Sequence, residues 1–248
     1  MSGHNKWASI KHKKAIADGK RGKVFTKLIR ELTVAAREGG GNPDTNARLR
    51  GLIVNAKAAN MPSDNIERAI KKGTGELEGV SYEEVLYEGY GPAGVAILVQ
   101  CLTDNKNRTA AEVRSAFTKG GGSMAGAGSV AWIFEKKGII IVPKNKTSED
   151  QLMDLVISAG AEDLSPSDEV FEVTTQPQDF HPVKEALDKA KIEVKSADVT
   201  MIPKNQVPVS ASDARSVLGL IETLEEMDDV QNVYANFDIP DEVMKEIS

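Results

Sequence analysis

The sequence predicts an α+β multidomain protein with an N-terminal three-helix domain, a middle α+β domain and an inserted ferredoxin-like α+β domain. Apolar residues recur with a helical period up to about residue 75 and with the strand period of two from about residue 82. The charge changes at the same place. Residues 1–75 contain sixteen cations and six carboxylates, a net charge of +10, whereas residues 76–248 contain fifteen and thirty-one, a net charge of −16. We therefore expect domains at residues 1–78, at 79–136 together with 204–248, and at 137–203.

The first helix is expected at about residues 23–38, where apolar side chains share one broad face. We expect that face to pack against the rest of the domain. Val34 lies on the opposite face, where we expect it to be exposed, and the pattern offers no reason for it. The other members of that face are basic, and we expect them to stay free for phosphate groups: Lys23, Lys27, Arg30 and Arg37.

Two further helices complete the N-terminal domain. The glycines and proline of residues 39–43 end the first helix, and a second is expected at about 45–59, with Arg48 and Arg50 pointing away from its buried side. Pro62 and the two residues after it open a short third helix, which Gly73 ends.

The middle domain begins with two expected strands, YEEVLYEGY and GVAILVQCL, joined around Gly91 and Pro92. Thr109 and Glu112 form a capping box, which predicts that a helix begins at Thr109. A glycine-rich loop, residues 120–128, is expected to be mobile and to be a contact site, and a strand, VAWIF, follows it. The loop matches a dinucleotide fingerprint by accident, since it precedes a strand instead of following one.

Residues 137–203 read as strand, helix, strand, strand, helix, strand, which is the ferredoxin-like order. A helix at about 213–227 and the strand VQNVYANF follow. Because the middle domain lacks one helix and one strand, we expect this tail to return to it. The alternative is two sequential domains and a separate tail.

The first thirty residues hold nine cations and one carboxylate, which indicates a basic arm for a polyanion. A solvated terminus is the alternative. We take seventeen residues as candidates for binding nucleic acid, mainly through phosphate groups. They are His4, Lys6, Trp7, Lys11, His12, Lys13, Lys14, Lys20, Arg21, Lys23, Lys27, Arg30, Arg37, Arg48, Arg50, Lys106 and Arg108.

Two helix starts are candidate phosphate sites, because cations gather there although a helix N-terminus is itself positive. Lys20, Arg21 and Lys23 surround the start of the first helix. Lys106 and Arg108 surround the start expected at Thr109. The alternative is that these long side chains turn into water.

No catalytic set, cofactor motif or metal site emerges from the sequence. His4 and His12 have no neighbouring cysteine or carboxylate, and Cys101 lies in an apolar run that is typical of a buried strand. One cysteine fits a reducing compartment, and neither a signal peptide nor a membrane span is present, so we expect a cytoplasmic protein. Two other classes stay open: an enzyme that uses loop 120–128 on a phosphate ester, and an adaptor whose acidic surface meets a protein.

Several long stretches resemble the YebC family, which includes the mitochondrial translational activator of cytochrome c oxidase. They are GHNKWASIKHKKAIADGKRGKVFTKLIRE, GGGNPDTNARLR, NMPSDNIERAIKKG, YEGYGPAGVAILV, TDNKNRTAAEVRSAFTKGGG, GSVAWIFEKKG and LEEMDDVQNVYANFDIP. The resemblance implies three domains and association with nucleic acid. It also implies either transcriptional regulation on DNA or action on the ribosome, where members are thought to ease proline-rich stalls.

We expect the ribosome to be the main partner and duplex DNA the alternative, because no helix of the basic domain carries a convincing set of base-reading side chains. The match begins next to Met1 with no transit peptide before it, which favours a bacterial member in the cytoplasm.

Overall fold

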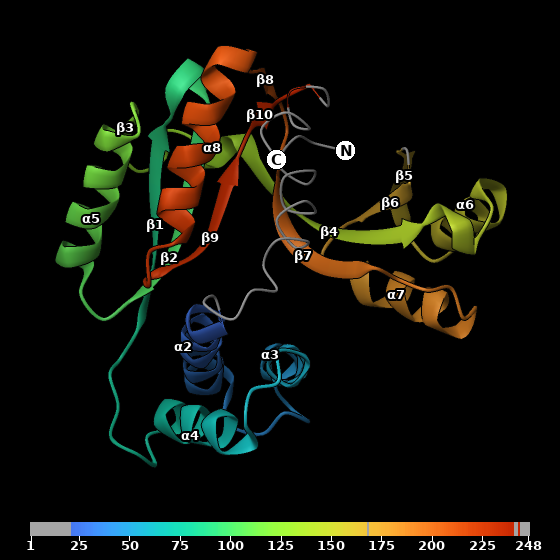
Figure 1. Ribbon diagram of the computed structural model, residues 1–248. Coiled ribbons are helices and arrows are strands. Elements are labelled where there is room, and N and C mark those ends of the chain that lie inside the picture. The colour runs from blue at the N-terminus through green and yellow to red at the C-terminus, as the bar shows by residue number, and fades with distance from the viewer. Residues whose placement is uncertain (1–20, 168, 241–242, 244–248) are drawn as a thin grey trace.

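The computed structural model describes residues 21–167, 169–240 and 243 (Figure 1). The described chain is α+β. Three helices form the lower unit in Figure 1, a four-stranded sheet with two helices forms the middle unit, and a second four-stranded sheet with two helices extends to the right. No helix of the described residues is long and apolar enough to cross a membrane.

The N-terminal unit consists of α2 (Arg21–Gly39), α3 (Ala47–Ala58) and α4 (Ser63–Thr74). Leu32, Leu49 and Ile66 contribute to its core, one from each helix. Gly73 permits a close crossing of α2 and α4, since a Cβ atom there would lie 2.3 Å from the carbonyl oxygen of Thr33. The buried Asn46 caps α3 and also donates to the carbonyls of Ala35 (2.8 Å) and Gly40 (2.9 Å), which fixes α3 against the end of α2.

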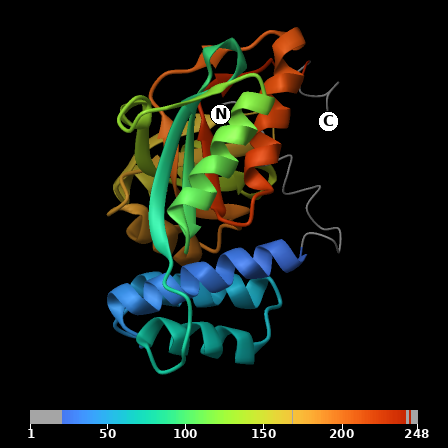
Figure 2. The ribbon, with the colours of Figure 1, turned by 90° about the vertical axis from the view of Figure 1, so that its left-hand side faces the viewer.

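The middle unit is an antiparallel sheet in the order β3-β1-β2-β9. Its strands are β1 (Glu83–Tyr90), β2 (Ala96–Thr103), β3 (Ser123–Ala125) and β9 (Val230–Ala235). Figure 2 shows its two helices side by side over one face: α5 (Lys106–Lys119) and α8 (Ala211–Glu225). Their apolar sides form one core with β2 and β9. The late part of the chain thus supplies both a helix and a strand of this unit.

Three local expectations for these units are wrong. Helix α5 begins at Lys106 under the cap of Asn105, one turn before Thr109. Residues 131–133 form a 3-10 turn, and the strand begins only at Phe134. Val34 is 1% exposed: it shares its side of α2 with Lys27 and Arg30, which contact the middle unit. Figure 2 shows α2 directly below that unit.

The second sheet has the antiparallel order β5-β6-β4-β7. Its strands are β4 (Phe134–Pro143), β5 (Ala161–Pro166), β6 (Val170–Thr175) and β7 (Ser196–Pro203). Helices α6 (Glu149–Ser158) and α7 (Phe180–Lys189) share its core. The expected order of residues 137–203 is present, but the boundary drawn between residues 136 and 137 falls inside β4. Strands β4 and β7 pair from Phe134–Pro203 onward and connect the second sheet to the middle unit (Figure 1).

A short parallel pair closes the middle unit. Strand β8 (Val207–Pro208) runs beside β10 (Phe237–Asp238), so the segment that leaves β7 returns to the end of the described chain. The buried Asn236 accepts a 2.7 Å hydrogen bond from the backbone N–H of Ala96. This contact fixes the C-terminal strands against β2.

Candidate nucleic-acid interface

The basic face of α2 is turned toward the middle unit. Lys23 Nζ donates to the carbonyl of Glu226 and Lys27 Nζ to that of Glu225, each at 3.0 Å. These carbonyls lie at the C-terminal end of α8, where the helix dipole is negative and cations are stabilising. The expectation that this face stays free for phosphates is therefore wrong for these lysines.

The two arginines of the same face are also engaged. Arg30 Nη1 donates to Leu102 O (3.1 Å), Asp228 O (2.7 Å) and Asp229 Oδ1 (2.6 Å), and its guanidinium lies 5.3 Å from the centre of the Tyr82 ring. Arg37 donates at 2.5 Å to Ser81 Oγ and to Tyr82 O. All four cations of this face thus join the N-terminal unit to the chain that follows it.

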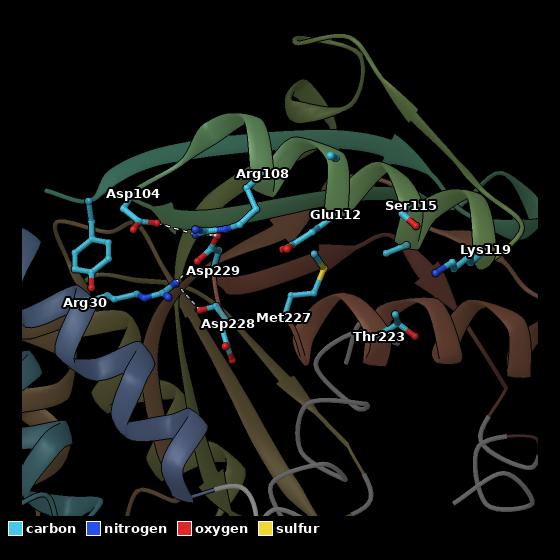
Figure 3. Close-up of a pocket in the computed structure, with 13 residues that line it drawn as sticks. Arg30, Asp104, Arg108, Glu112, Ser115, Lys119, Thr223, Met227, Asp228 and Asp229 are labelled. Carbon is cyan, nitrogen blue, oxygen red and sulfur yellow. Dashed lines mark hydrogen bonds and ion pairs between the residues drawn. The ribbon is translucent and has the colours of Figure 1, made fainter. Parts of the chain in front are cut away.

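Asp229 is the centre of this joint, and Figure 3 shows Arg30 and Arg108 converging on it from α2 and α5. Its side chain is only 4% exposed. Oδ1 accepts from Arg30, and Oδ2 accepts from Arg108 (2.9 Å), Thr109 (2.6 Å) and Thr103 (3.1 Å). Burial acts to raise the pKa of Asp229, but the hydroxyl and guanidinium donors outweigh it and hold the pKa at about 2. The carboxylate is therefore ionised at neutral pH.

The phosphate site expected at the start of α5 is occupied by carboxylates of the chain. Arg108 donates to Asp104 (2.7 Å) as well as to Asp229, and both bonds raise its pKa. Lys106 pairs with Glu83. Thr109 is fully buried, and its hydroxyl binds Asp229. In this structure Lys106 and Arg108 are ion-pair partners of these carboxylates, and their role as phosphate ligands stays a prediction.

A groove of about 770 Å³ lies beside the joint, between α5 and α8 (Figure 3). Its charged lining contains Arg30, Arg108 and Lys119 together with Asp104, Glu112, Asp228 and Asp229. The cations and carboxylates at its α2 end bind one another. These ion pairs hold the α2 end of the groove together.

The glycine-rich loop already binds an anion of the chain itself. The buried carboxylate of Glu88 accepts from the backbone N–H groups of Gly128 (2.6 Å), Val130 (2.6 Å) and Ala131 (2.8 Å). Burial acts to raise the pKa of Glu88, yet these donors lower it overall. Because the loop is held in this way and residues 123–125 pair with β1, the expectation of a mobile loop is wrong. Of the loop's own amides, that of Gly128 is therefore taken by Glu88.

Helix α3 presents exposed cations that the joint does not use, as α4 does with Arg68, Lys71 and Lys72. Its sequence, ARLRGLIVNAKA, has three cations and no carboxylate. Arg50, Val54 and Lys57 are exposed at helical spacing on one face. Arg48 is exposed on another side of the helix, where it pairs with Glu38 at 2.6 Å. A Cβ atom on Gly51 would meet nothing within 4 Å, so the surface is open there. Sequence reasoning missed Lys57, although its spacing from Arg50 signalled a shared face.

The remaining candidates fall outside what the structure describes. Eight candidates precede the described residues: His4, Lys6, Trp7, Lys11, His12, Lys13, Lys14 and Lys20. For Arg21, the structure describes only that it is the first residue of α2. The first-helix phosphate site rests on Lys20 and Arg21 and stays a prediction. Within the described residues, no group of histidine, cysteine and acidic side chains could hold a metal ion. Cys101 is buried, and burial raises the pKa of its thiol to about 12, so it is no thiolate nucleophile.

Two models of known protein families match most of the chain. The model described as the TACO1/YebC N-terminal domain matches residues 5–76, and the model of the TACO1/YebC second and third domain matches residues 82–237. The chain belongs to the TACO1/YebC family. The expected family resemblance is thereby confirmed.

Relatives of the chain can be aligned with it over nearly its whole length. A protein of Desulfatibacillum aliphaticivorans named "probable transcriptional regulatory protein" is 61% identical over 99% of this chain and 100% of its own length. A protein of Geobacter sulfurreducens with the same description is 58% identical over 100% of both chains. A crystal structure of a conserved hypothetical protein from Aquifex aeolicus has a TM-score of 0.80 and 51% identity, and the match covers 90% of this chain and 93% of that one.

Proposed function

We propose that this TACO1/YebC protein is a non-enzymatic regulator of gene expression that binds nucleic acid through its N-terminal helical unit. The observation that carries the proposal is the exposed face of α3 with Arg50 and Lys57, on a helix that contains no carboxylate. Arg50 Nη1 also donates to the carbonyls of Pro43 and Asp44. Phosphate groups contribute most of the affinity in nucleic-acid complexes. A helix face of this kind is suited to them.

The charge distribution supports the same orientation of the bound polyanion. The net charge of +10 on residues 1–75 is opposite to the −16 on residues 76–248, so a nucleic acid is attracted first to the helical unit. We propose that the basic residues before α2 extend the α3 surface. The acidic units then remain available to protein partners.

We further propose that the target is the ribosome, and that the protein acts in the cytoplasm to ease stalled translation of proline-rich sequences, as the family resemblance implies. Among the described residues of α3, Asn55 is the one exposed polar side chain besides the cations. A single amide is a poor set of groups for reading base edges. Contacts to phosphates without base readout suit a folded RNA.

Transcriptional regulation on duplex DNA is the second candidate. The names of the relatives from Desulfatibacillum and Geobacter favour it. The exposed face of α3 runs along this twelve-residue helix, so it can also lie against a duplex backbone. The two candidates differ in partner and not in the surface used.

The test is sedimentation of a cell lysate through sucrose, with the full-length chain carrying Arg50→Glu or Lys57→Glu. We expect each variant to leave the ribosomal fractions in which the wild-type protein sediments. Lys189→Glu is the matched control, since Lys189 is 80% exposed on α7, in the other half of the molecule. If both α3 variants sediment like the wild type, α3 is not the interface. If the wild type is absent from ribosomes and is recovered on promoter DNA, the DNA candidate is correct.

A further inference from the structure

Two aromatic side chains of the middle unit are exposed although the chain is poor in aromatic residues. Aromatics make up 5% of the sequence. Trp132 is 65% exposed and Tyr90 is 38% exposed, and they are the aromatic members of the exposed large hydrophobic residues that the structure describes. An exposed tryptophan that does not pack into a core is typical of a recognition surface.

Both rings are held by hydrogen bonds to the same acceptor atom. Trp132 Nε1 donates to the carbonyl oxygen of Ser129 at 3.0 Å, and the Tyr90 hydroxyl donates to the same oxygen at 3.3 Å. The hydrogen-bonding groups of the two rings are therefore used within the chain. What the rings still offer to a partner is their flat faces, which suits a stacking ligand more than a hydrogen-bonding one.

The backbone that carries this pair is rigidly supported. Glu88 lies two residues before Tyr90 on β1, and its carboxylate binds the N–H groups of Gly128, Val130 and Ala131, directly before Trp132. The loop and the strand are thus joined on both sides of Ser129. A surface fixed in advance loses little entropy when a ligand binds. The bonds to backbone N–H groups also compensate the negative charge of Glu88.

Two exposed lysines whose backbone lies close to Trp132, one along the chain and one on the neighbouring strand segment, favour an anionic ligand. Lys204 is exposed, and its backbone N–H donates to the carbonyl of Ile133 at 2.9 Å. Lys136 is exposed four residues after Trp132, while Glu135 is paired with Lys137 at 3.1 Å. Cations beside exposed rings are the combination that binds single-stranded nucleic acid, in which bases stack and phosphates meet lysines.

We propose that Tyr90 and Trp132 form a stacking site for an unpaired nucleobase, with Lys136 and Lys204 serving the flanking phosphates. This inference rests on the proposed nucleic-acid binding and extends it to a second, base-contacting site on the middle unit. Such a site holds a single-stranded segment while the α3 surface holds the phosphates of a folded region.

Tryptophan emission tests the proposal directly. The chain has two tryptophans, so Trp7→Phe leaves Trp132 as the sole emitter in the full-length protein. We expect titration with oligouridylate or oligoadenylate to quench that emission, and an abasic oligonucleotide of the same length to leave it unchanged. Trp132→Ala should weaken binding of the oligonucleotide by about fivefold or more, and Trp132→Phe should retain most of it. The melting temperatures of both variants are measured as a control for folding.

Three outcomes overturn the proposal. Equal quenching by the abasic oligonucleotide means that only phosphates bind there. Unchanged emission, together with salt-dependent binding that Arg50→Glu still abolishes, refutes the stacking site and leaves the proposed function standing. Loss of ribosome association by Trp132→Ala without quenching by any oligonucleotide assigns the pair to a protein partner instead. The proposed function itself fails separately, if neither structured RNA nor duplex DNA is retained by the wild-type chain.

Discussion

Arg30 and Asp229 are 199 positions apart in the sequence, yet Nη1 of the arginine lies 2.6 Å from Oδ1 of the aspartate. Both side chains are largely buried, at 12% and 4% exposure. The pair joins the N-terminal helical unit to the sheet that the last strands complete. Through the second oxygen of Asp229 it also reaches Arg108 and Thr109 on α5. One carboxylate therefore contacts both α2 and α5, in addition to the bonds by which Lys23, Lys27 and Arg37 hold the helical unit.

Asp229→Asn should destabilise the protein, because the buried guanidinium of Arg30 would lose its counter-charge, whereas the more exposed Arg108 keeps Asp104. Breaking one side of a buried ion pair costs about 3–5 kcal/mol. Urea unfolding measures the change. Asp228→Asn is the matched control, since Asp228 is exposed and Arg30 binds its backbone carbonyl. If the Asp229→Asn variant is as stable as the control, the cluster does not hold the units together.

The same carboxylate predicts a pH dependence. The pKa of Asp229 is about 2 in the folded protein, below its ordinary 3.8, so the group stabilises the fold fully above about pH 4. That stabilisation should disappear as the pH falls from 3.8 through 2, where the folded state would have to take up a proton. Melting temperatures of the wild type and Asp229→Asn should consequently converge in that range. If the melting temperatures of the two proteins keep a constant difference down to pH 2, Asp229 does not have the lowered pKa.

Glu31 should act in the opposite direction. Burial raises its pKa above the ordinary 4.5, Arg48 and Lys27 oppose the shift, and Glu84 adds to it. The folded state therefore holds its proton to a higher pH than the unfolded chain does, and stability falls as the pH rises through the raised pKa. We expect Glu31→Gln to raise the melting temperature at pH 7 and to have little effect at pH 4. Glu67→Gln, on the exposed surface of α4, provides the comparison.

Arg108→Glu should lower the melting temperature, because it places a third carboxylate beside Asp104 and Asp229. The sequence predicts the reverse, an unchanged or slightly raised melting temperature, on the reading of Arg108 as a phosphate ligand at a helix start. Thermal unfolding at low and moderate salt separates the two. If the variant has the wild-type melting temperature but binds nucleic acid weakly, Arg108 is a phosphate ligand.

The salt dependence of nucleic-acid binding should identify which cations touch phosphates. Each contact adds about −0.7 to −0.9 to the slope of log K against log salt. The sequence predicts six to eight contacts and a slope of about −4 to −7, but four of the cations on α2, namely Lys23, Lys27, Arg30 and Arg37, have other partners. We expect Arg50→Ala to reduce the slope by about one contact and Lys23→Ala to leave it unchanged. A slope that responds to Lys23 and not to Arg50 would place the interface on α2.

Much of the fold followed from local patterns. The expected second helix, residues 45–59, is α3 at Ala47–Ala58, and the expected helix at 149–159 is α6 at Glu149–Ser158. These succeed because an amphipathic period and a cap are written in adjacent residues. The start of α5 shows the limit of that logic. Thr109 fits a capping box, but its hydroxyl has a better partner in Asp229, so Asn105 caps the helix instead.

The sequence by itself determined the types of the elements, the division of charge and the family. The tertiary structure alone decided what the basic face of α2 meets. Periodicity reports which side chains share a face, and a face of lysines and arginines reads the same whether water, a phosphate or a helix end lies opposite. Here the end of α8 and Asp229 lie opposite Lys23, Lys27 and Arg30. Partners that distant in sequence meet only when the chain has folded, so no local pattern contains them.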